Sequence, residues 1–213
     1  MLAKALGADL SNPYREKQYN YRNYDVVINY GVAKDIAGNL FNSTYAVNVC
    51  KNKLRTLDIL SQVGIPVPKF SAYAVIAQQF NDTIVCHTEQ EGMQNKGIVY
   101  HERDNGQPIP RAYLYTEYFH HKREYRVVVL NYKVVGIYRK EEIEDGTWDL
   151  IPLSHKGFYS ISKACVKAAK AIGIQYVGFD VVANTREDFR ILEANSGPII
   201  TDQVIDAFKQ LFK

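Results

Sequence analysis

The sequence predicts an α+β fold, in which a strand-rich middle lies between helical ends. Apolar segments typical of strands follow one another between residues 71 and 140. Apolar stripes with helical spacing occur at residues 52–63, 160–172 and 201–212, and the chain has no internal repeat. With 213 residues, of which 46% are hydrophobic and 23% charged, the chain can bury a substantial core.

The N-terminal fifty residues contain few regular elements. Residues 2–7 are expected to form the end of a helix that Gly7 closes. The polar, tyrosine-rich segment 11–24 follows; packing on the domain surface is favoured over stacking on nucleic-acid bases, the alternative for aromatic residues interleaved with basic ones. Residues 25–31 predict a short strand that runs into a glycine turn.

A helix and a series of strands are expected in the middle of the chain. Leu54, Leu57 and Leu60 recur at helical spacing in the helix 52–63, which ends at Gly64 before two prolines. The strands are expected at residues 71–76, 83–87, 97–101 and 114–119, with a proline-containing loop at 102–111, followed by a hairpin of 125–130 and 133–140 that turns at Asn131-Tyr132.

The last third combines two helices with a second hairpin. The helix 160–172 carries Ile161, Cys165, Ala168 and Ile172 on one stripe. Strands are expected at residues 174–183 and 189–194, joined by the polar turn 184–188. A final helix spans residues 201–212, with inward-facing Val204, Ile205, Phe208, Leu211 and Phe212.

The late hairpin carries a possible set of metal ligands. In one register Asp180 lies opposite Glu193, with Cβ atoms roughly 5 Å apart, and Asn195 points to the same face. Two facing carboxylates repel each other unless a cation lies between them. Carboxylate and amide oxygens suit Mg²⁺ that also holds nucleotide phosphates. The alternative is a solvated hairpin with acidic residues on its wet face, which a register shift of one residue would favour.

Earlier segments carry residues suited to a nucleotide phosphate or base. Lys53 begins a helix, where a cation and free backbone amides can both meet phosphate. Residues 85–87 lead into a loop in which Gly92 and Gly97 let backbone amides approach phosphate closely. The strand end 115–119 can present backbone groups and one carboxylate to an adenine edge.

Two further segments are suited to a reacting phosphate. Glu124 and Arg126 share one strand face, and Arg139 and Lys140 end the next strand, where they can clamp a transferring phosphoryl group. All of these segments except Arg139-Lys140 also have an ordinary interpretation: a solvated lysine, a hairpin loop, a buried strand with one acid, and an ion pair between Glu124 and Arg126. Their order along the chain is more informative than any single segment.

Taken together, the segments resemble the ATP-grasp superfamily, in particular the branch of the ribosomal-protein glutamate ligase and the small ATP-grasp proteins of bacteriophages. The resemblance extends over residues 25–200, and Asn29-Tyr30-Gly31 resembles the segment that precedes the helix in the phage proteins. The matching motifs are Asn52-Lys53-Leu54, Gly64-Ile65-Pro66-Val67-Pro68, residues 85–98, Glu117-Tyr118-Phe119, Glu124-Tyr125-Arg126-Val127, residues 134–140, Asp180 and Glu193-Ala194-Asn195.

The resemblance implies two α+β subdomains that grip ATP, here at residues 51–115 and 116–213, after a reduced α/β segment at 1–50. ATP and Mg²⁺ are the implied cofactors, with Mn²⁺ as an alternative metal. In the implied roles, Lys53 and His87 bind phosphate, Glu117, Tyr118 and Phe119 form the adenine hinge, Glu124 reaches the ribose, Asp180, Glu193 and Asn195 hold the metal, and Arg126, Arg139 and Lys140 face the reacting groups.

The implied activity is that of a carboxylate–amine ligase, which forms an amide through an acyl phosphate and releases ADP and phosphate. The substrates would be small or protein-borne carboxylates and amines, and a homo-oligomer is one option. Two departures from the family pattern, His87 in place of lysine or arginine and Asn95 in place of glycine, favour an alternative: an ATP-binding or regulatory module that has lost catalysis. A phosphotransferase acting on a hydroxyl acceptor is a third hypothesis.

Charge and cysteine content restrict the partners and the compartment. A net charge of +3 does not by itself indicate nucleic acid or a membrane surface, although residues 120–123 form a local basic run. Cys50, Cys86 and Cys165 show no disulfide or metal-site spacing, which predicts reduced thiols. Without a signal peptide or a membrane-spanning run, we expect a cytoplasmic protein, in the host cytoplasm if a phage encodes it.

Overall fold

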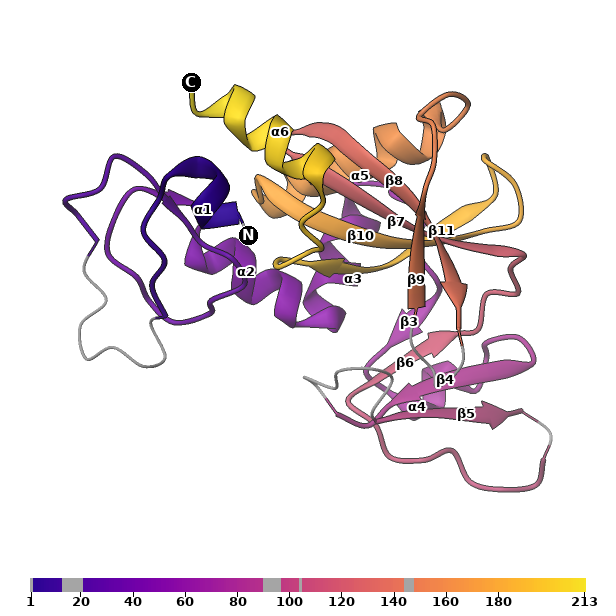
Figure 1. Ribbon diagram of the computed structural model, residues 1–213. Helices are drawn as coiled ribbons and strands as arrows, with labels where there is room; N and C mark the ends of the chain where they lie inside the picture. The colour runs from indigo at the N-terminus through magenta and orange to yellow at the C-terminus, as the bar shows by residue number, and fades with distance from the viewer. Residues whose placement is uncertain (1, 13–20, 90–96, 104, 144–147) are drawn as a thin grey trace.

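The computed structural model describes residues 2–12, 21–89, 97–103, 105–143 and 148–213 (Figure 1). Its helices are α1 (Leu2–Leu6), α2 (Thr44–Lys51), α3 (Lys53–Gln62), α4 (Ala74–Ala77), α5 (Tyr159–Ile172) and α6 (Asp202–Leu211). Its strands are β1 (Val27–Ile28), β2 (Leu40–Phe41), β3 (Phe70–Ser71), β4 (Thr83–His87), β5 (Ile98–Glu102), β6 (Leu114–Glu117), β7 (Arg123–Leu130), β8 (Lys133–Glu142), β9 (Trp148–Pro152), β10 (Tyr176–Ala183) and β11 (Phe189–Asn195). The mixture of helices and antiparallel sheets confirms the predicted α+β class.

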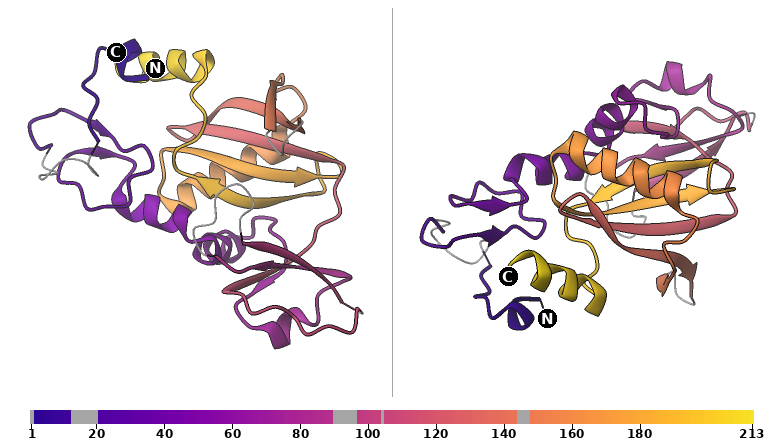
Figure 2. Two further views of the ribbon diagram at one scale, coloured as in Figure 1. Left: turned by 60° about the horizontal axis from the view of Figure 1, so that its bottom comes forward. Right: turned by 90° about the horizontal axis from the view of Figure 1, so that it is seen from above.

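The larger sheet has five antiparallel strands in the order β11-β10-β7-β8-β9. Successive side chains of a strand point to opposite faces, so the sheet has two apolar layers. One layer includes Val127 and Phe179 and packs under α5, whereas the other includes Val128 and Tyr176 and packs under α6. Figure 2 shows the two helices on opposite faces of this sheet.

The smaller sheet has four antiparallel strands in the order β3-β6-β4-β5. Its own apolar cluster consists of Ala77, Phe80, Ile84, Cys86 and Tyr115, beside α4. The chain passes from β6 to β7 through residues 118–122, which therefore link the two sheets (Figure 1). The predicted division of the chain at residues 50 and 115 remains a prediction.

Most predicted elements in the last two thirds of the chain are present. The predicted hairpin register, with Asp180 opposite Glu193, is confirmed, and an irregularity in the ladder follows Asp180. The β7–β8 hairpin turns at Asn131 and Tyr132, whose positive φ angles of 45° and 59° suit a tight two-residue turn. Of the α6 residues expected to face inward, Val204, Ile205 and Phe208 are buried, but Phe212 lies beyond the helix and is 39% exposed.

The strand predicted at residues 71–76 is wrong beyond Ser71. The hydroxyl of Ser71 accepts a hydrogen bond from the amide of Tyr73 at 2.9 Å, and the chain turns there into the short helix α4. The sequence pattern does not predict β9 or the helix α2. Ser43 caps α2 by accepting from the amide of Ala46. The glycine loop with Gly92 and Asn95 lies outside the described residues.

The N-terminal segment is fastened to the larger sheet by the buried side chain of Asn42. Its Oδ1 accepts from the amides of Gln175 and Tyr176 at 2.9 and 2.8 Å, and its Nδ2 donates to the carbonyl of Tyr176 at 2.8 Å. The side chain is fully buried, so these hydrogen bonds lie away from solvent.

We therefore expect Asn42→Ala to lower the free energy of unfolding by about 3 kcal/mol, because it leaves buried backbone groups unsatisfied. Urea denaturation measures the loss. Asn48→Ala is the matched control, since Asn48 is exposed and donates a single bond to Ala33. Equal losses in the two variants would show that Asn42 does not hold the segment in place.

Candidate active site

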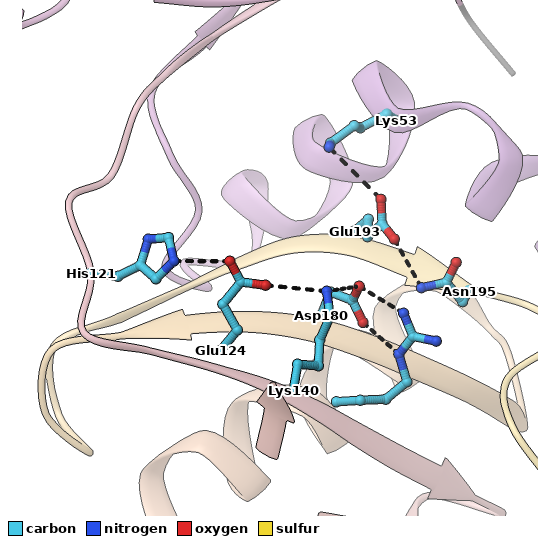
Figure 3. A network of polar contacts seen from close by, with 8 residues as sticks. Lys53, His121, Glu124, Lys140, Asp180, Glu193 and Asn195 are labelled. Carbon is cyan, nitrogen blue, oxygen red and sulfur yellow. Dashed lines mark hydrogen bonds and ion pairs between the residues drawn. The ribbon is translucent and has the colours of Figure 1, made fainter. Parts of the chain in front are cut away.

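Most of the predicted site residues on β7, β8, β10 and β11 share one face of the five-stranded sheet. Asp180 on β10 is paired with Glu193 on β11 and with Arg126 on β7, and Glu124 is paired with Lys140 on β8. Figure 3 shows the polar network that these side chains form with Lys53, His121 and Asn195. The sheet register therefore brings together residues that are far apart in the sequence.

Asp180 is the centre of the network and is buried. Arg126 donates from Nε to Oδ1 at 2.6 Å and from Nη2 to Oδ2 at 2.7 Å, and Lys140 Nζ donates to Oδ2 at 3.1 Å. Burial alone would raise the pKa of Asp180, but the hydrogen bonds and charges of Arg126 and Lys140 lower it. Asp180 is therefore an anion held by two cations.

The two cations respond in the opposite sense. Burial would lower the pKa of Arg126 and of Lys140, but the pairing with Asp180, and for Lys140 also with Glu124, raises it. The expected alternative, an ion pair between Glu124 and Arg126, is absent, because each of these residues pairs across to another strand. Arg126, Lys140 and Asp180 therefore carry their charges at neutral pH.

Glu193 and Asn195 extend the network toward α3. Asn195 Nδ2 donates to Glu193 Oε1 at 3.1 Å, and Lys53 Nζ lies 3.8 Å from Glu193 Oε2. Lys53 begins α3 directly after Asn52, which caps the helix by accepting from the amide of Arg55. Lys53 is thus held at a helix N-terminus, above the strand that carries Glu193 (Figure 3).

Asp180, Glu193 and Asn195 fit a hard divalent cation by their chemistry. They are oxygen donors on facing and alternate positions of two paired strands. The Asn195 amide uses its nitrogen on Glu193, and no donor among the described residues reaches its Oδ1. Within the described ranges, no cluster of three or more His, Cys, Asp or Glu side chains offers another metal site.

His87 occupies the position that the resemblance assigns to a phosphate-binding cation, but it is neutral. The side chain is 5% exposed, and its Nε2 lies 3.2 Å from Thr116 Oγ1. Burial, together with the nearby charge of Lys53, lowers the pKa of His87 to about 3. The sequence indicated a partly charged residue, because the burial of the strand end was not visible in it.

Of the predicted hinge residues, Glu117 ends β6, and Tyr118 and Phe119 lie in the connection between the sheets. The carboxylate of Glu117 pairs with Lys69 at 3.0 Å and does not join the network around Asp180. The Tyr118 ring packs against His120, and Arg190 lies 4.6 Å over the ring of Phe119. An adenine-binding hinge contacts the base through backbone groups, which these side-chain contacts do not test. The hinge role of these residues therefore remains a prediction.

A cavity of about 250 Å³ adjoins the network on the side of β8 and β9. At its edge His121 Nε2 lies 3.0 Å from Glu124 Oε1, and Lys140 Nζ lies 4.7 Å from the centroid of the Trp148 ring. Sequence reasoning missed Trp148, since the short strand β9 gave no recognisable pattern. The lining residues are His121, Lys122, Arg123, Glu124, Arg139, Lys140, Glu141 and Trp148.

Arg139 differs from the other predicted catalytic residues. It follows Tyr138 and precedes Lys140 on β8, so its side chain points to the opposite face of the sheet from Lys140. Its guanidinium pairs with Glu141, and its Nε is buried without a partner in the described part of the chain. The geometry therefore does not bring Arg139 into the network around Asp180.

The N-terminal segment reaches the same site near Asn195. The hydroxyl of Tyr30 donates to the carbonyl of Pro198, and its ring lies 3.4 Å from the position that a Cβ at Gly197 would occupy. Burial raises the pKa of Tyr30, while the charge of Arg126 acts against this rise. Tyr30 therefore borders the site beside Arg126.

Known proteins with related sequences are ligases. No family model matches the sequence. Glutamate–LysW ligase ArgX of Sulfolobus acidocaldarius is 23% identical over 190 residues, which cover 74% of this chain and 64% of that protein. A probable alpha-L-glutamate ligase of Aeromonas salmonicida is 27% identical over 183 residues, which cover 74% and 59%. The chain thus spans less than two thirds of the length of either relative.

Solved structures show the fold. The ATP-grasp ligase PsnB, in complex with a minimal precursor, Mg and ADP, has a TM-score of 0.62 at 19% identity and covers 83% of this chain and 63% of its own. D-alanine–D-alanine ligase from Bacillus anthracis has a TM-score of 0.59 at 14% identity and covers 79% and 65%. The chain therefore has the ATP-grasp fold.

Proposed function

We propose that this protein is an ATP-dependent carboxylate–amine ligase. The observation that carries the proposal is the convergence of Lys53, Arg126 and Lys140 on the oxygens of Asp180 and Glu193, on one face of an ATP-grasp sheet. Three cations around two carboxylates suit a polyanionic nucleotide bound together with a metal. The relatives named as glutamate ligases support the same reaction class.

The reaction follows from the chemistry of the substrates. A carboxylate oxygen attacks the γ-phosphorus of ATP, the bond from that phosphorus to the β–γ bridging oxygen breaks, and ADP leaves. The amine nitrogen then attacks the carbon of the acyl phosphate, phosphate leaves with the bonding electrons, and the nitrogen loses a proton. No covalent bond to the protein is needed, and none of the three buried cysteines is activated, because burial raises the pKa of Cys50, Cys86 and Cys165.

Each side chain has a defined part in this scheme. Asp180, Glu193 and Asn195 would hold Mg²⁺, which neutralises phosphate charge when it is bound. Arg126 and Lys140 stabilise the negative charge that develops on the transferred phosphate and on the acyl oxygen. Lys53 meets the phosphates at the start of α3, and Glu124 accepts from the ribose hydroxyls.

The test is a reaction with ATP, Mg²⁺ and a panel of acids and amines. Because the curated relatives are glutamate ligases, glutamate is tested first, both as the acid and as the amine. A peptide is included because PsnB was solved with a precursor. Ligation predicts ADP release that needs both partners, and a product with the mass of both substrates less one water. A product that carries phosphate without condensation would indicate a phosphotransferase instead.

A second candidate is a nucleotide-binding module without catalysis. It is favoured by His87, whose neutral ring replaces a cation in the phosphate site. This candidate predicts binding of ATP in calorimetry, with no product from any acid and amine in the panel.

The neutral state of His87 leads to a pH prediction. Because its pKa is about 3, the ring stays neutral as the pH falls from about 8 to about 5, and it adds no charge to the phosphate site. We expect the ratio of ADP affinities between the wild type and His87→Gln to stay constant over this range in calorimetry. A wild type that gained affinity over the variant below about pH 6.5 would contradict this, since that gain requires an imidazolium.

A further inference from the structure

One ammonium group is shared by three partners at the centre of the network. Lys140 Nζ lies 3.2 Å from Glu124 Oε2, 3.1 Å from Asp180 Oδ2 and 4.7 Å from the centroid of the Trp148 ring. The side chain of Lys140 is 13% exposed, so little water competes for the ammonium. Figure 3 shows it between the two carboxylates.

In the proposed function, Glu124 and Asp180 each bind a group other than Lys140. Glu124 would accept from the ribose, and Asp180 would bind the metal. Each oxygen of Asp180 already accepts at least one hydrogen bond from a cation, and Oδ2 accepts two. A magnesium nucleotide and Lys140 therefore compete for the same oxygens.

Of the two cations on Asp180, Lys140 is the one suited to leave. Arg126 makes two parallel bonds through a planar group whose geometry matches the carboxylate. Its side chain also packs beside β10, because its Cδ lies 3.5 Å from the position that a Cβ at Gly178 would occupy. Lys140 makes one contact with each carboxylate through a flexible side chain. It can therefore rotate away without breaking a two-bond contact such as that of Arg126.

We propose that Lys140 exchanges partners when a magnesium nucleotide binds: it leaves Glu124, Asp180 and the Trp148 ring and turns to the phosphates. The proposal rests on the proposed function and adds a change of partners at Lys140. Until the nucleotide is bound, both carboxylates hold the ammonium. Trp148 is then a positioning residue that helps to hold Lys140 in the free protein.

The chain carries its own reporter for this exchange, since Trp148 is its single tryptophan. The departure of a charge from the ring changes the tryptophan emission. The experiment titrates the wild type with ADP and Mg²⁺ while emission is recorded, and calorimetry follows binding in parallel. We expect an emission change that saturates together with nucleotide binding.

Two variants make the result specific. Lys140→Met removes the ammonium, so we expect it to bind ADP with no comparable emission change. Lys133→Met makes the same substitution at the other end of β8, where Lys133 is exposed, and it should behave as the wild type. The proposal is overturned if wild-type emission stays constant while ADP binds, or if Lys140→Met shows the wild-type change.

A metal titration without nucleotide tests the competition directly. In the free protein Lys140 occupies Asp180, so Mn²⁺ alone should bind weakly, and Lys140→Met should bind it at least about fivefold more tightly in electron paramagnetic resonance. Equal Mn²⁺ affinity would overturn the exchange. A protein that binds ADP and passes both tests but forms no amide would refute the ligase proposal and leave the exchange standing. Failure to bind ADP would overturn both.

Discussion

Asp180→Asn is expected to reduce amide formation by about 10²- to 10³-fold. The substitution removes a proposed metal ligand and leaves Arg126 and Lys140 without the carboxylate that pairs with both. The amide keeps the shape of the side chain but cannot hold Arg126 and Lys140 as an anion does. Steady-state ADP release, with the best substrate pair from the panel, measures the loss. Asp188→Asn is the control, because the side chain of Asp188 is 49% exposed at the hairpin turn. An unchanged rate in Asp180→Asn would exclude a role for Asp180 in catalysis.

The same variant is expected to lose about 3 kcal/mol of unfolding free energy, because two partly buried cations lose their common partner. The pH dependence has a defined sign. The pKa of Asp180 is lowered in the folded state, so its contribution to stability is present above the unfolded-state pKa. It is lost as the pH falls through the folded-state pKa. Urea denaturation should therefore show a shallower loss of stability toward acid pH in Asp180→Asn than in the wild type.

Glu193→Ala should affect catalysis strongly and stability little. The side chain of Glu193 is 40% exposed, and its pairing with Lys53 at 3.8 Å is loose, so we expect a change in unfolding free energy below about 1 kcal/mol. Loss of one of three metal ligands should lower turnover by about 10²-fold and weaken Mn²⁺ binding in the presence of ADP.

Glu102→Ala, at an exposed position on β5, is the matched control for this change. If Glu193→Ala retained the wild-type rate, the assignment of the metal to the late hairpin would fail. If it lost stability as well as activity, Lys53 and Glu193 would be a structural pair rather than two ligand-binding groups.

The late hairpin could be predicted because its information is local. The two strands are separated by a short polar turn, so their alternation sets the register that places Asp180 opposite Glu193. The partner of Asp180 could not be predicted in the same way. Arg126 reaches it through the pairing of β7 with β10, which depends on the packing of the whole sheet. The sequence therefore predicted the pairing of Asp180 with Glu193 but not the ion pairs of Asp180 with Arg126 and Lys140.

The features that the sequence did not predict also depend on contacts with other parts of the chain. The apolar residues 74–77 suit a strand or a helix, and the hydrogen bond from Tyr73 to Ser71 decides for a helix. His87 departs from the ATP-grasp pattern already in the sequence, but its burial against Thr116 arises from the pairing of β4 with β6. Trp148 contacts Lys140 only because β9 adds to the edge of the sheet.

The central position of β10 in the larger sheet affects the local stability of the backbone that carries Asp180. All eight residues of this strand are buried, and β7 and β11 form hydrogen bonds to its two sides. We therefore expect the backbone around Asp180 to resist local unfolding. The smaller sheet has a separate apolar cluster and is connected through loops near residues 63–69 and 118–122. We therefore expect backbone amides to exchange more slowly in β10 than in the strands of the smaller sheet.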